Sequence, residues 1–553
     1  MRAASASAAR VDVPATAVGS RVPARGVSST AIPDIDACCH VPITDHSATP
    51  PFNLAETGAG SANPVMPTSL VQIAELTDGE VFATGERPPV TDVTHDSREA
   101  GPGVLFACRP GAVTDGHDFA AGAVERGSPA LLVERRLDLP VPQVRVDSVA
   151  QRLGAVAAAV HGDPTRALTV VGVTGTNGKT TCATLLEAVL TAAGRRAGLI
   201  GTIVTRIDGQ EVSGVRTTPE ATDLQRLYRR MLTVGVDSVA MEVSSHGLEL
   251  GRVNGTRFAV ALFTNLTHDH LDFHGSMDAY FAAKARLFTP EFTGAGVVNV
   301  DDRWGARLAE QATVPVTTVS CGAVPEADVV ATDIRADATG SGVMARIDGQ
   351  QLELAIGMPG MFNVANALMV LTAARVLGIR SSAVAATLEH PPAVAGRMER
   401  IEEGQPFTVL VDYAHTPDSL ARVLEATRAI VDGRVLVVIG CGGDRDREKR
   451  PAMGAAAVSG ADHAFFTNDN PRTEDPRSIL DAMVVGARPV AGARWTVEPD
   501  RRAAIAAALQ TAQPGDAVIV AGKGHETGQQ LADRTVPFDD REVTRALLRQ
   551  ETM

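Results

Sequence analysis

The sequence predicts an α/β protein of three domains. A central, doubly wound and mostly parallel sheet is flanked by an N-terminal α/β domain and a C-terminal Rossmann-like α/β domain. Two observations predict this fold class. Along residues 165–391, short apolar runs typical of buried strands alternate with helical segments, which favours a parallel sheet covered by helices. The chain has 553 residues, enough for about three or four domains of ordinary size.

Composition and charge exclude several classes of protein. Hydrophobic residues make up 44% of the chain and charged residues 21%, which is typical of a soluble globular protein. The net charge of −14 disfavours nucleic acid as a partner, and no apolar run approaches the roughly 20 residues of a membrane span. The six cysteines have no paired spacing, so we expect no disulfide framework, no structural zinc site and a reducing, cytoplasmic location.

Residues 1–65 differ from the rest. They are rich in Ala, Ser, Pro, Thr, Val and Gly without a sustained period, which predicts a disordered tail. Their arginine-rich, acid-poor start is loosely like a transit peptide, but we favour translation from Met66 or a dispensable tail. Breakers near residues 161–164 and 390–392 predict three domains, over 66–163, 164–391 and 392–553.

Apolar runs predict the strands of each domain. In the N-terminal domain, strands are expected at 103–108 and 130–133, with a helix at 119–126 between them. The strands predicted for the central and C-terminal domains are 168–173, 197–203, 238–243, 260–265, 296–300, 407–411, 435–439, 464–467 and 517–521.

The central domain opens with a glycine-rich turn between a strand and a helix. The apolar run 168–173 leads into the turn, and a helix is expected over 183–193. This is the architecture of a P-loop, in which backbone N–H groups and a lysine face nucleotide phosphates and a hydroxyl reaches Mg²⁺. Val173 stands where the general pattern has its first glycine. The predicted nucleotide-binding residues are Gly175, Thr176, Asn177, Gly178, Lys179, Thr180 and Thr181, with Thr180 as a magnesium ligand.

Two further strands end in polar residues. Glu242 closes the run 238–243, where a buried carboxylate needs a partner, and Mg²⁺ beside a P-loop is the natural one. The segment 264–274 places three histidines and two aspartates after the next strand, which suggests metal or phosphate chemistry. Zinc remains an alternative to magnesium there.

The form of the glycine turn and the segment 264–274 resemble the Mur ligase family, ATP-dependent enzymes that add amino acids to the peptidoglycan precursor. The resemblance covers about residues 68–545. It implies an N-terminal domain that binds a uridine-diphosphate substrate, a central ATP-binding domain and a C-terminal amino-acid-binding domain. It also implies Mg²⁺ held near His270 and by a carbamoylated Lys284, beside Thr180 and Glu242. The implied catalytic residues are Lys179, Glu242, His270 and Lys284.

The same resemblance implies contacts for the other ligands. Asn366 is expected near the adenine, Asp412 near the ribose and Arg397 at the phosphates, although a structural ion pair is an equal alternative for Arg397. Ser97 and the loop of Ala112, Val113 and Thr114 resemble the uridine-diphosphate site. The positions that hold the sugar and the peptide acid are Thr217, Thr218, Ser244 and Arg252.

The run 469–472 resembles the selecting motif of the family members that add meso-diaminopimelate. Diaminopimelate differs from lysine by one carboxylate on its far end, which an arginine fork binds bidentately. The residues implied at this site are Arg445, Asp469, Asn470, Pro471, Arg472, Gly522 and Glu526, with Glu526 facing an ammonium group.

The resemblance therefore implies an ATP-dependent amide ligase. Its small-molecule substrates would be ATP, meso-diaminopimelate and UDP-N-acetylmuramoyl-L-alanyl-D-glutamate, joined through an acyl phosphate by a cytoplasmic monomer. A lysine-adding relative and a folylpolyglutamate synthetase are the alternatives within the ligases. From other classes, a P-loop ATPase acting on a partner protein and a non-catalytic scaffold remain open.

Overall fold

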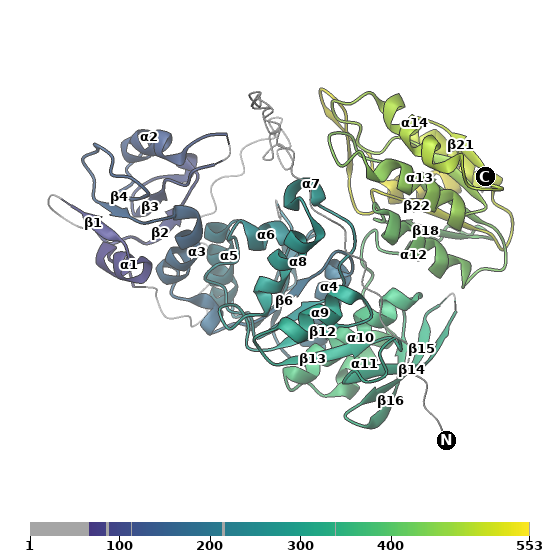
Figure 1. Cartoon of the computed structure of the whole chain (residues 1–553), viewed down its shortest axis with the longest axis horizontal. Helices are drawn as coiled ribbons and strands as arrows, with labels where there is room; N and C mark the ends of the chain where they lie inside the picture. The colour runs from purple at the N-terminus through teal and green to yellow at the C-terminus, as the bar shows by residue number, and fades with distance from the viewer. Residues whose placement is uncertain (1–65, 84–87, 112, 213–215, 338, 552–553) are drawn as a thin grey trace, which may run out of the picture.

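The computed structural model describes residues 66–83, 88–111, 113–212, 216–337 and 339–551. Figure 1 shows them as three blocks that follow one another along the chain, each with its own main sheet. The predicted α/β fold class is confirmed, because each main sheet is largely parallel and has helices packed on both faces. The tail 1–65 lies outside the described residues, and the three domain limits stay predictions.

The N-terminal block is built on a five-stranded sheet. Its elements are α1 (Leu70–Thr77), β1 (Glu80–Phe82), β2 (Asp92–Thr94), η3 (Ser97–Glu99), β3 (Val104–Ala107), η4 (Gly116–Phe119), α2 (Ala120–Glu125), β4 (Ala130–Val133), β5 (Gln143–Arg145) and α3 (Val149–Val160). The strand order is β1-β5-β4-β3-β2, with β1 antiparallel to β5 and the other pairs parallel. α1 and α3 pack on one face of this sheet and α2 on the other.

The central block carries an 11-stranded sheet. Its elements are η5 (Pro164–Arg166), β6 (Thr169–Thr174), α4 (Lys179–Ala192), β7 (Ala197–Ile200), β8 (Thr205–Ile207), β9 (Gln210–Val212), α5 (Ala221–Thr233), β10 (Ser238–Glu242), α6 (Ser245–Glu249), β11 (Val260–Phe263), α7 (Leu271–His274), α8 (Met277–Ala285), η6 (Arg286–Phe288), β12 (Gly296–Asn299), α9 (Arg303–Gln311), β13 (Val316–Ser320), β14 (Val329–Ala336), β15 (Ser341–Ile347), β16 (Gln350–Ile356), α10 (Met361–Val376) and α11 (Ser381–Glu389).

β6 lies in the middle of this sheet, between β10 and β11. The chain fills one side of β6 with β7 and β10 and then crosses to the other side with β11, β12 and β13. In such a sheet, ligands bind beyond the carboxyl end of the strand where the order reverses. α4, α10 and α11 cover one face, and α5, α8 and α9 cover the other. The residues after β6 therefore lie at the position where this fold binds ligands.

The C-terminal block has a six-stranded sheet in the order β17-β18-β22-β19-β20-β21. Its elements are β17 (Glu399–Arg400), β18 (Thr408–Asp412), α12 (Pro417–Arg428), β19 (Val435–Ile439), α13 (Lys449–Gly460), β20 (His463–Phe466), α14 (Pro476–Ala487), β21 (Trp495–Val497), α15 (Arg501–Thr511), β22 (Ala517–Ala521), β23 (Gly528–Gln530), β24 (Thr535–Pro537) and α16 (Asp540–Glu551). α12, α13 and α14 pack on one face, α15 and α16 on the other, and β23 and β24 form a separate hairpin.

Every strand predicted from an apolar run is present, within a few residues of its predicted limits. The helix predicted over 183–193 begins earlier, at Lys179. The sequence does not predict the antiparallel extension of β14, β15 and β16 or the strands β8 and β9. β15 lies between β14 and β16 and buries alternate residues, because this antiparallel part of the sheet keeps one face toward solvent, so it lacks a continuous apolar run. Among the described residues, no helix is long and apolar enough to cross a membrane.

Candidate active site

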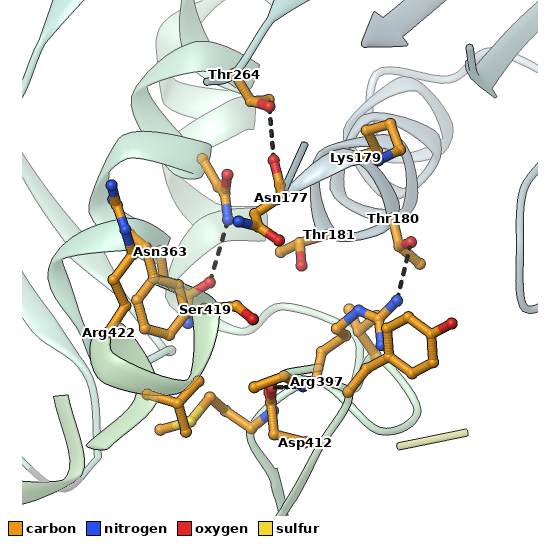
Figure 2. A pocket seen from close by; sticks show the side chains of 18 of the residues that line it. Asn177, Lys179, Thr180, Thr181, Thr264, Asn363, Arg397, Asp412, Ser419 and Arg422 are labelled. Atoms are coloured by element: carbon orange, nitrogen blue, oxygen red, sulfur yellow. Dashed lines mark hydrogen bonds between the residues drawn. The ribbon is translucent and has the colours of Figure 1, made fainter. Parts of the chain in front are cut away.

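A cavity of about 1050 Å³ lies beyond the carboxyl ends of β6, β10 and β11. Residues of the central and C-terminal blocks line it together, and Figure 2 shows Asn177, Lys179 and Thr180 across from Arg397 and Asp412. Predicted site residues that line this cavity are Thr176, Asn177, Gly178, Lys179, Thr180, Thr181, Thr217, Glu242, Ser244, His270, Lys284, Asn366, Arg397 and Asp412.

The turn between β6 and α4 requires its glycines. Gly175 and Gly178 have φ of +147° and +87°, which side chains rarely adopt. A Cβ on Gly175 would lie 1.9 Å from Thr264 Oγ1, and one on Gly178 would lie 2.5 Å from Asn366 Oδ1. Gly178 is followed directly by α4, so the first backbone N–H groups of that helix point into the cavity with their partial positive charge.

The segment after β11 fixes the glycine turn in place. Asn265 Oδ1 accepts a hydrogen bond from the Asn177 backbone N–H at 2.9 Å, and Thr264 Oγ1 donates to the Asn177 carbonyl at 2.6 Å (Figure 2). The Asn177 side-chain Nδ2 is buried and has no hydrogen-bond partner among the described residues. A buried donor of this kind favours a ligand with acceptor oxygens, such as a phosphate.

Two lysines, the half-buried Lys179 and the buried Lys284, meet at the turn. Lys179 Nζ donates to the carbonyls of Gly175 at 2.9 Å and Thr176 at 2.7 Å. Lys284 Nζ also donates to the Gly175 carbonyl, at 2.9 Å, and its side chain is buried. Burial lowers the pKa of Lys179. Burial and the nearby positive charge of Lys179 together hold the pKa of Lys284 well below its ordinary value, which favours the neutral amine.

Glu242 sits at the end of β10 and is 1% exposed. It accepts hydrogen bonds from Thr180 Oγ1 at 3.0 Å and from Thr202 through both its backbone N–H, at 2.7 Å, and its hydroxyl, at 3.0 Å. The carboxylate and the Thr180 hydroxyl are hard oxygen donors beside the glycine turn that is predicted to bind phosphate. Mg²⁺ typically takes one or two carboxylates and completes its shell with phosphate oxygens and water, so these residues fit that ion.

The histidines of the predicted metal segment pack with aromatic rings. His246 lies 4.9 Å from His270 and 4.2 Å from Phe273 between ring centroids, and His274 stacks on Tyr280 at 5.0 Å. Burial, with smaller effects of neighbouring positive groups, lowers the pKa of His246 to about 3 and of His274 to about 4, so both are neutral near pH 7. Within the described ranges, no group of three or more His, Cys, Asp or Glu residues is placed to hold a metal.

The predicted sugar and peptide-acid residues form one hydrogen-bonded group beside Glu242. Thr218 Oγ1 donates to the Glu242 carbonyl at 3.1 Å and accepts from the Ser244 N–H at 3.0 Å. Thr217 Oγ1 lies 3.0 Å from Thr202 Oγ1, within hydrogen-bond distance, and Arg252 Nη1 donates to the Thr218 carbonyl at 3.5 Å. The structure therefore brings these four predicted residues together beside the carboxyl end of β10.

Glu220 is a residue of this region that sequence reasoning missed. Its carboxylate pairs with Arg109 Nη1 at 3.0 Å, Arg216 Nη1 at 2.9 Å and Arg252 Nε at 2.9 Å. Arg109 follows β3 in the N-terminal block, so this cluster joins two blocks. The i, i+4 spacing of Arg216 and Glu220 around two threonines is the signal that was available in the sequence.

The residues predicted to contact the nucleotide lie on the C-terminal side of the cavity. Arg397 Nη2 donates to Thr180 Oγ1 at 3.5 Å (Figure 2). Its guanidinium lies 4.4 Å above the Tyr413 ring. Asp412 ends β18 and accepts from the backbone N–H groups of Met398 at 2.7 Å and Ala414 at 2.8 Å. Burial raises the pKa of Asp412, against the lowering effect of Arg397. Asn366, on α10, faces the glycine turn from the central block.

The run 469–472 forms a second polar group in the C-terminal block. Asn470 Nδ2 donates to Glu526 Oε2 at 2.9 Å, and a Cβ on Gly522 would meet Asp469 Oδ2 at 2.9 Å. A Cβ on Gly442 would lie 3.0 Å from Arg472 Nη1 and 3.7 Å from Arg445 Cγ, which places both arginines beside that glycine. Pro471 lies inside the same run, with its carbonyl against Gly443.

Lys523 holds this second group together and was also missed. It is fully buried, and its Nζ donates to Asn470 Oδ1 at 3.0 Å and to Glu526 Oε2 at 2.9 Å. Lysine and arginine together number 51, yet lysine stands only at positions 179, 284, 449 and 523. Because arginine is the usual basic residue of this chain, each of the four lysines marks a position where a compact ammonium group is a candidate requirement. This bias in composition could have pointed to Lys523 from the sequence.

Some predicted residues lie away from the cavity. Ser97 begins η3, Val113 is exposed, and the Thr114 carbonyl accepts from Gly111 N–H at 2.9 Å. In the described ranges, neither these residues nor the run 469–472 lines the cavity. Ala112 lies outside the described residues.

Fold and site together define an α/β protein with a P-loop-like glycine turn, whose adjoining cavity is lined by the central and C-terminal blocks. Family models agree with this class: the Mur ligase family catalytic domain matches residues 89–161, the Mur ligase middle domain 173–374, and the Mur ligase glutamate ligase domain 396–524. The chain belongs to the Mur ligase family.

Individual relatives are similar over most of their length. The chain is 45% identical to the UDP-N-acetylmuramoyl-L-alanyl-D-glutamate--2,6-diaminopimelate ligase of Streptomyces coelicolor, over 89% of this chain and 99% of that protein. It is 46% identical to the ligase of the same name from Corynebacterium glutamicum, over 81% and 89%. A solved structure of a ligase with this name aligns with a TM-score of 0.65 and 32% identity, over 88% of this chain and all of that one. MurF from Acinetobacter baumannii, at 19% identity and a TM-score of 0.61, shares the fold.

Proposed function

We propose that this protein is an acid–amino-acid ligase that uses ATP to add meso-2,6-diaminopimelate to UDP-N-acetylmuramoyl-L-alanyl-D-glutamate in peptidoglycan precursor synthesis. The observation that carries the proposal is the 45% identity to a relative of that name across 99% of the relative's length. The cavity supports it, because a phosphate-binding turn, a buried carboxylate and two lysines lie where ATP and a carboxylate substrate would meet.

The first step would be phosphorylation of the free glutamyl carboxylate. A carboxylate is a poor electrophile, so its oxygen attacks the γ-phosphorus of ATP, ADP leaves, and an acyl phosphate forms. The N-terminus of α4 and Lys179 would bind the phosphate oxygens, and Arg397 approaches Thr180 from the opposite wall. Mg²⁺, when bound, would neutralise charge on the transferred phosphoryl group. Thr180 and Glu242 would hold it.

Lys284 has the chemistry that carbamoylation requires. A neutral amine reacts with CO₂ to give a carbamate, an anionic oxygen donor suited to a hard cation. Burial and Lys179 favour that neutral amine at Lys284. We propose a carbamate at Lys284 and a further metal contact near His270, whose ring lies 6.1 Å from the Tyr280 ring on the same helix as Lys284.

The second step would be attack by the amine of diaminopimelate on the acyl phosphate, which forms the amide and releases phosphate. The group around the run 469–472 would select this substrate. Arg472 would pair with its distal carboxylate, and Glu526, which lies next to Asn470 and Lys523, would face its ammonium group. The N-terminal residues Ser97, Val113 and Thr114 would bind the uridine diphosphate. A cytoplasmic monomer remains our prediction.

The decisive experiment follows phosphate release with ATP, Mg²⁺ and the UDP-muramoyl dipeptide, adding meso-diaminopimelate or L-lysine in parallel. We expect turnover with diaminopimelate alone, and a roughly 100-fold loss of kcat/KM in Arg472→Ala, because a guanidinium–carboxylate contact is removed. Turnover with lysine would indicate a lysine-adding enzyme. Equal turnover without any amino acid would indicate an ATPase that acts on a partner.

A further inference from the structure

The hairpin of β23 and β24 lies against the run 469–472. Gln529 Nε2 donates to the Asp469 carbonyl at 2.7 Å. The Gln530 backbone N–H donates to Asn470 Oδ1 at 2.9 Å, and the Gln530 carbonyl accepts from the Arg472 N–H at 3.1 Å. Each residue of the run that carries a side-chain role is thus bonded to this hairpin, which lies about 60 residues further along the chain.

Arg472 adopts a backbone conformation that needs support. Its φ is +51°, in the left-handed region that non-glycine residues rarely adopt because it is sterically strained. The preceding Pro471 has no N–H, so the local backbone contributes one donor fewer. The Arg472 N–H bond to the Gln530 carbonyl supports this conformation, which determines the direction in which the Arg472 side chain leaves the chain.

The Arg472 side chain is also held by the hairpin. Its Nε donates to Gln530 Oε1 at 2.8 Å, and its Nη1 donates to the Gly443 carbonyl at 2.7 Å. These two acceptors are neutral, whereas the Asp469 carboxylate is near enough for the charge of Arg472 to help lower its pKa. A neutral amide oxygen fixes the plane of a guanidinium without cancelling its charge, whereas a carboxylate at the same place would compete with an anionic substrate group.

We propose that Gln530 is the positioning residue of the amino-acid site: it fixes the Arg472 guanidinium so that a carboxylate on the far end of the substrate is selected. The inference rests on the proposed function and extends it to a residue outside the selecting run. Gln530 acts through Arg472, by one side-chain and one backbone bond to that residue and a further backbone bond to Asn470. Support of a binding group by a neutral neighbour is the general means by which a site is kept rigid.

The test uses Gln530→Ala in the full-length enzyme, because alanine removes the side-chain bond and leaves both backbone bonds. KM and kcat are measured separately for meso-diaminopimelate, ATP and the UDP-muramoyl dipeptide. We expect the KM for diaminopimelate to rise about 10-fold or more, since a hydrogen bond to a charged group is lost, with the other two KM values changed less than about 2-fold. The ratio of kcat/KM for diaminopimelate to kcat/KM for lysine should fall by a similar factor.

Gln530→Glu separates the geometry from the charge. Glutamate keeps an oxygen at the same place but would pair with Arg472 as an anion, so we expect its KM for diaminopimelate to be at least as high as that of Gln530→Ala. The matched control is Asp533→Ala in the tip of the hairpin, where the exposed Asp533 pairs with Arg534. This control should retain the wild-type KM for all three substrates.

Two outcomes would overturn the proposal. One is a Gln530→Ala enzyme whose KM for diaminopimelate stays within 2-fold of wild type, and the other is an equal rise in all three KM values. Calorimetric binding of diaminopimelate to wild type separates this result from a failure of the proposed function. If the wild-type enzyme neither binds nor turns over diaminopimelate, the proposed function and the positioning role of Gln530 are both overturned. If it binds and turns over diaminopimelate but Gln530→Ala leaves the KM unchanged, only the positioning role is overturned.

Discussion

Lys179 and Lys284 donate hydrogen bonds to the same acceptor, the carbonyl oxygen of Gly175. Two ammonium groups at one oxygen in a buried site repel each other strongly. The conflict is relieved if one lysine is neutral, and Lys284 is the one whose pKa is held well below its ordinary value by burial and by Lys179. The glycine turn therefore couples Lys179, for which we propose phosphate binding, to the neutral amine of Lys284.

The first prediction concerns the chemistry of that amine. An ordinary lysine, with a pKa of about 10.4, is almost wholly protonated at pH 7, whereas Lys284 should react with CO₂ there. In ¹³CO₂-equilibrated protein, we expect a carbamate signal in the NMR spectrum that increases as pH rises through the lowered pKa of Lys284. Lys284→Met should lose the signal and at least about 100-fold in kcat.

The melting temperature of Lys284→Met should match or exceed that of wild type, because a buried amine is replaced by an apolar chain of similar length. A carbamate signal that persists in this variant would assign the modification to another group. If the wild-type enzyme is fully active but shows no carbamate signal, the carbamate at Lys284 is not needed for the reaction.

The second prediction separates backbone strain from steric contact at the glycine turn. Gly178 and Gly194 have nearly the same φ, +87° and +82°, but a Cβ on Gly178 would meet Asn366 Oδ1 whereas one on Gly194 would meet nothing within 4 Å. Gly194→Ala should cost about 1–2 kcal/mol of stability and leave the KM for ATP unchanged. Gly178→Ala should show a similar loss of stability and also raise the KM for ATP about 10-fold. Equal KM values in the two variants would exclude a phosphate-binding role for the turn.

The third prediction concerns the stability of the C-terminal block. Arg501 and Asp540 form an ion pair at 2.6 Å in which both side chains are fully buried, and Arg501 also donates to the Ala521 carbonyl at 2.8 Å. Asp540→Ala leaves a buried guanidinium without its carboxylate and should cost about 3–5 kcal/mol in urea unfolding. Asp533→Ala, in the exposed pair with Arg534, should change stability by less than about 1 kcal/mol. Similar values for the two variants would show that water reaches Arg501.

The sequence could predict those features whose residues lie close together along the chain. The glycine turn, Lys179 and Thr180 are adjacent in the chain, and the apolar runs that become β6, β10 and β11 are buried on both faces, so local pattern was sufficient. Glu242 was predictable because a carboxylate ending such a run must be paired.

The residues that sequence reasoning missed act through contacts that are distant along the chain. Gln530 meets Arg472 across 58 residues, and Arg109 meets Glu220 across 111. Nothing local distinguishes Gln530 from a solvent-exposed strand residue, because its partner is decided by how the β23–β24 hairpin docks. Lys523 had a compositional signal, but its two acceptors became known only from the fold.

The last prediction tests the arginine cluster that joins the N-terminal and central blocks. Burial raises the pKa of Glu220, but Arg252 and Arg109 outweigh that effect and lower it below its ordinary value. A carboxylate with a lowered pKa stabilises the fold above its unfolded value of about 4.3, and the contribution is lost as pH falls through the folded-state value. The cluster is therefore intact near neutral pH.

Arg109→Ala removes the one arginine of this cluster that comes from the N-terminal block, next to the loop that leads to Thr114. We expect the KM for the UDP-muramoyl dipeptide to rise about 10-fold, with the KM for ATP unchanged, because the N-terminal substrate loop is no longer fixed to the Arg252 site. Any loss of melting temperature should be largest near pH 7 and disappear as pH falls through the lowered folded-state pKa of Glu220.

Arg226→Ala is the matched control for Arg109→Ala. Arg226 also joins the two blocks, through Asp92 at 3.2 Å, but neither residue contacts Glu220 or Arg252 in the hydrogen bonds and ion pairs of the described residues. It should weaken docking of the N-terminal block without a selective effect on the UDP-muramoyl dipeptide. If both variants raise that KM equally, Arg109 acts only through domain docking. If only Arg109→Ala does so, the Glu220 cluster orients the substrate, because the two variants differ in the cluster and not in the interface they loosen.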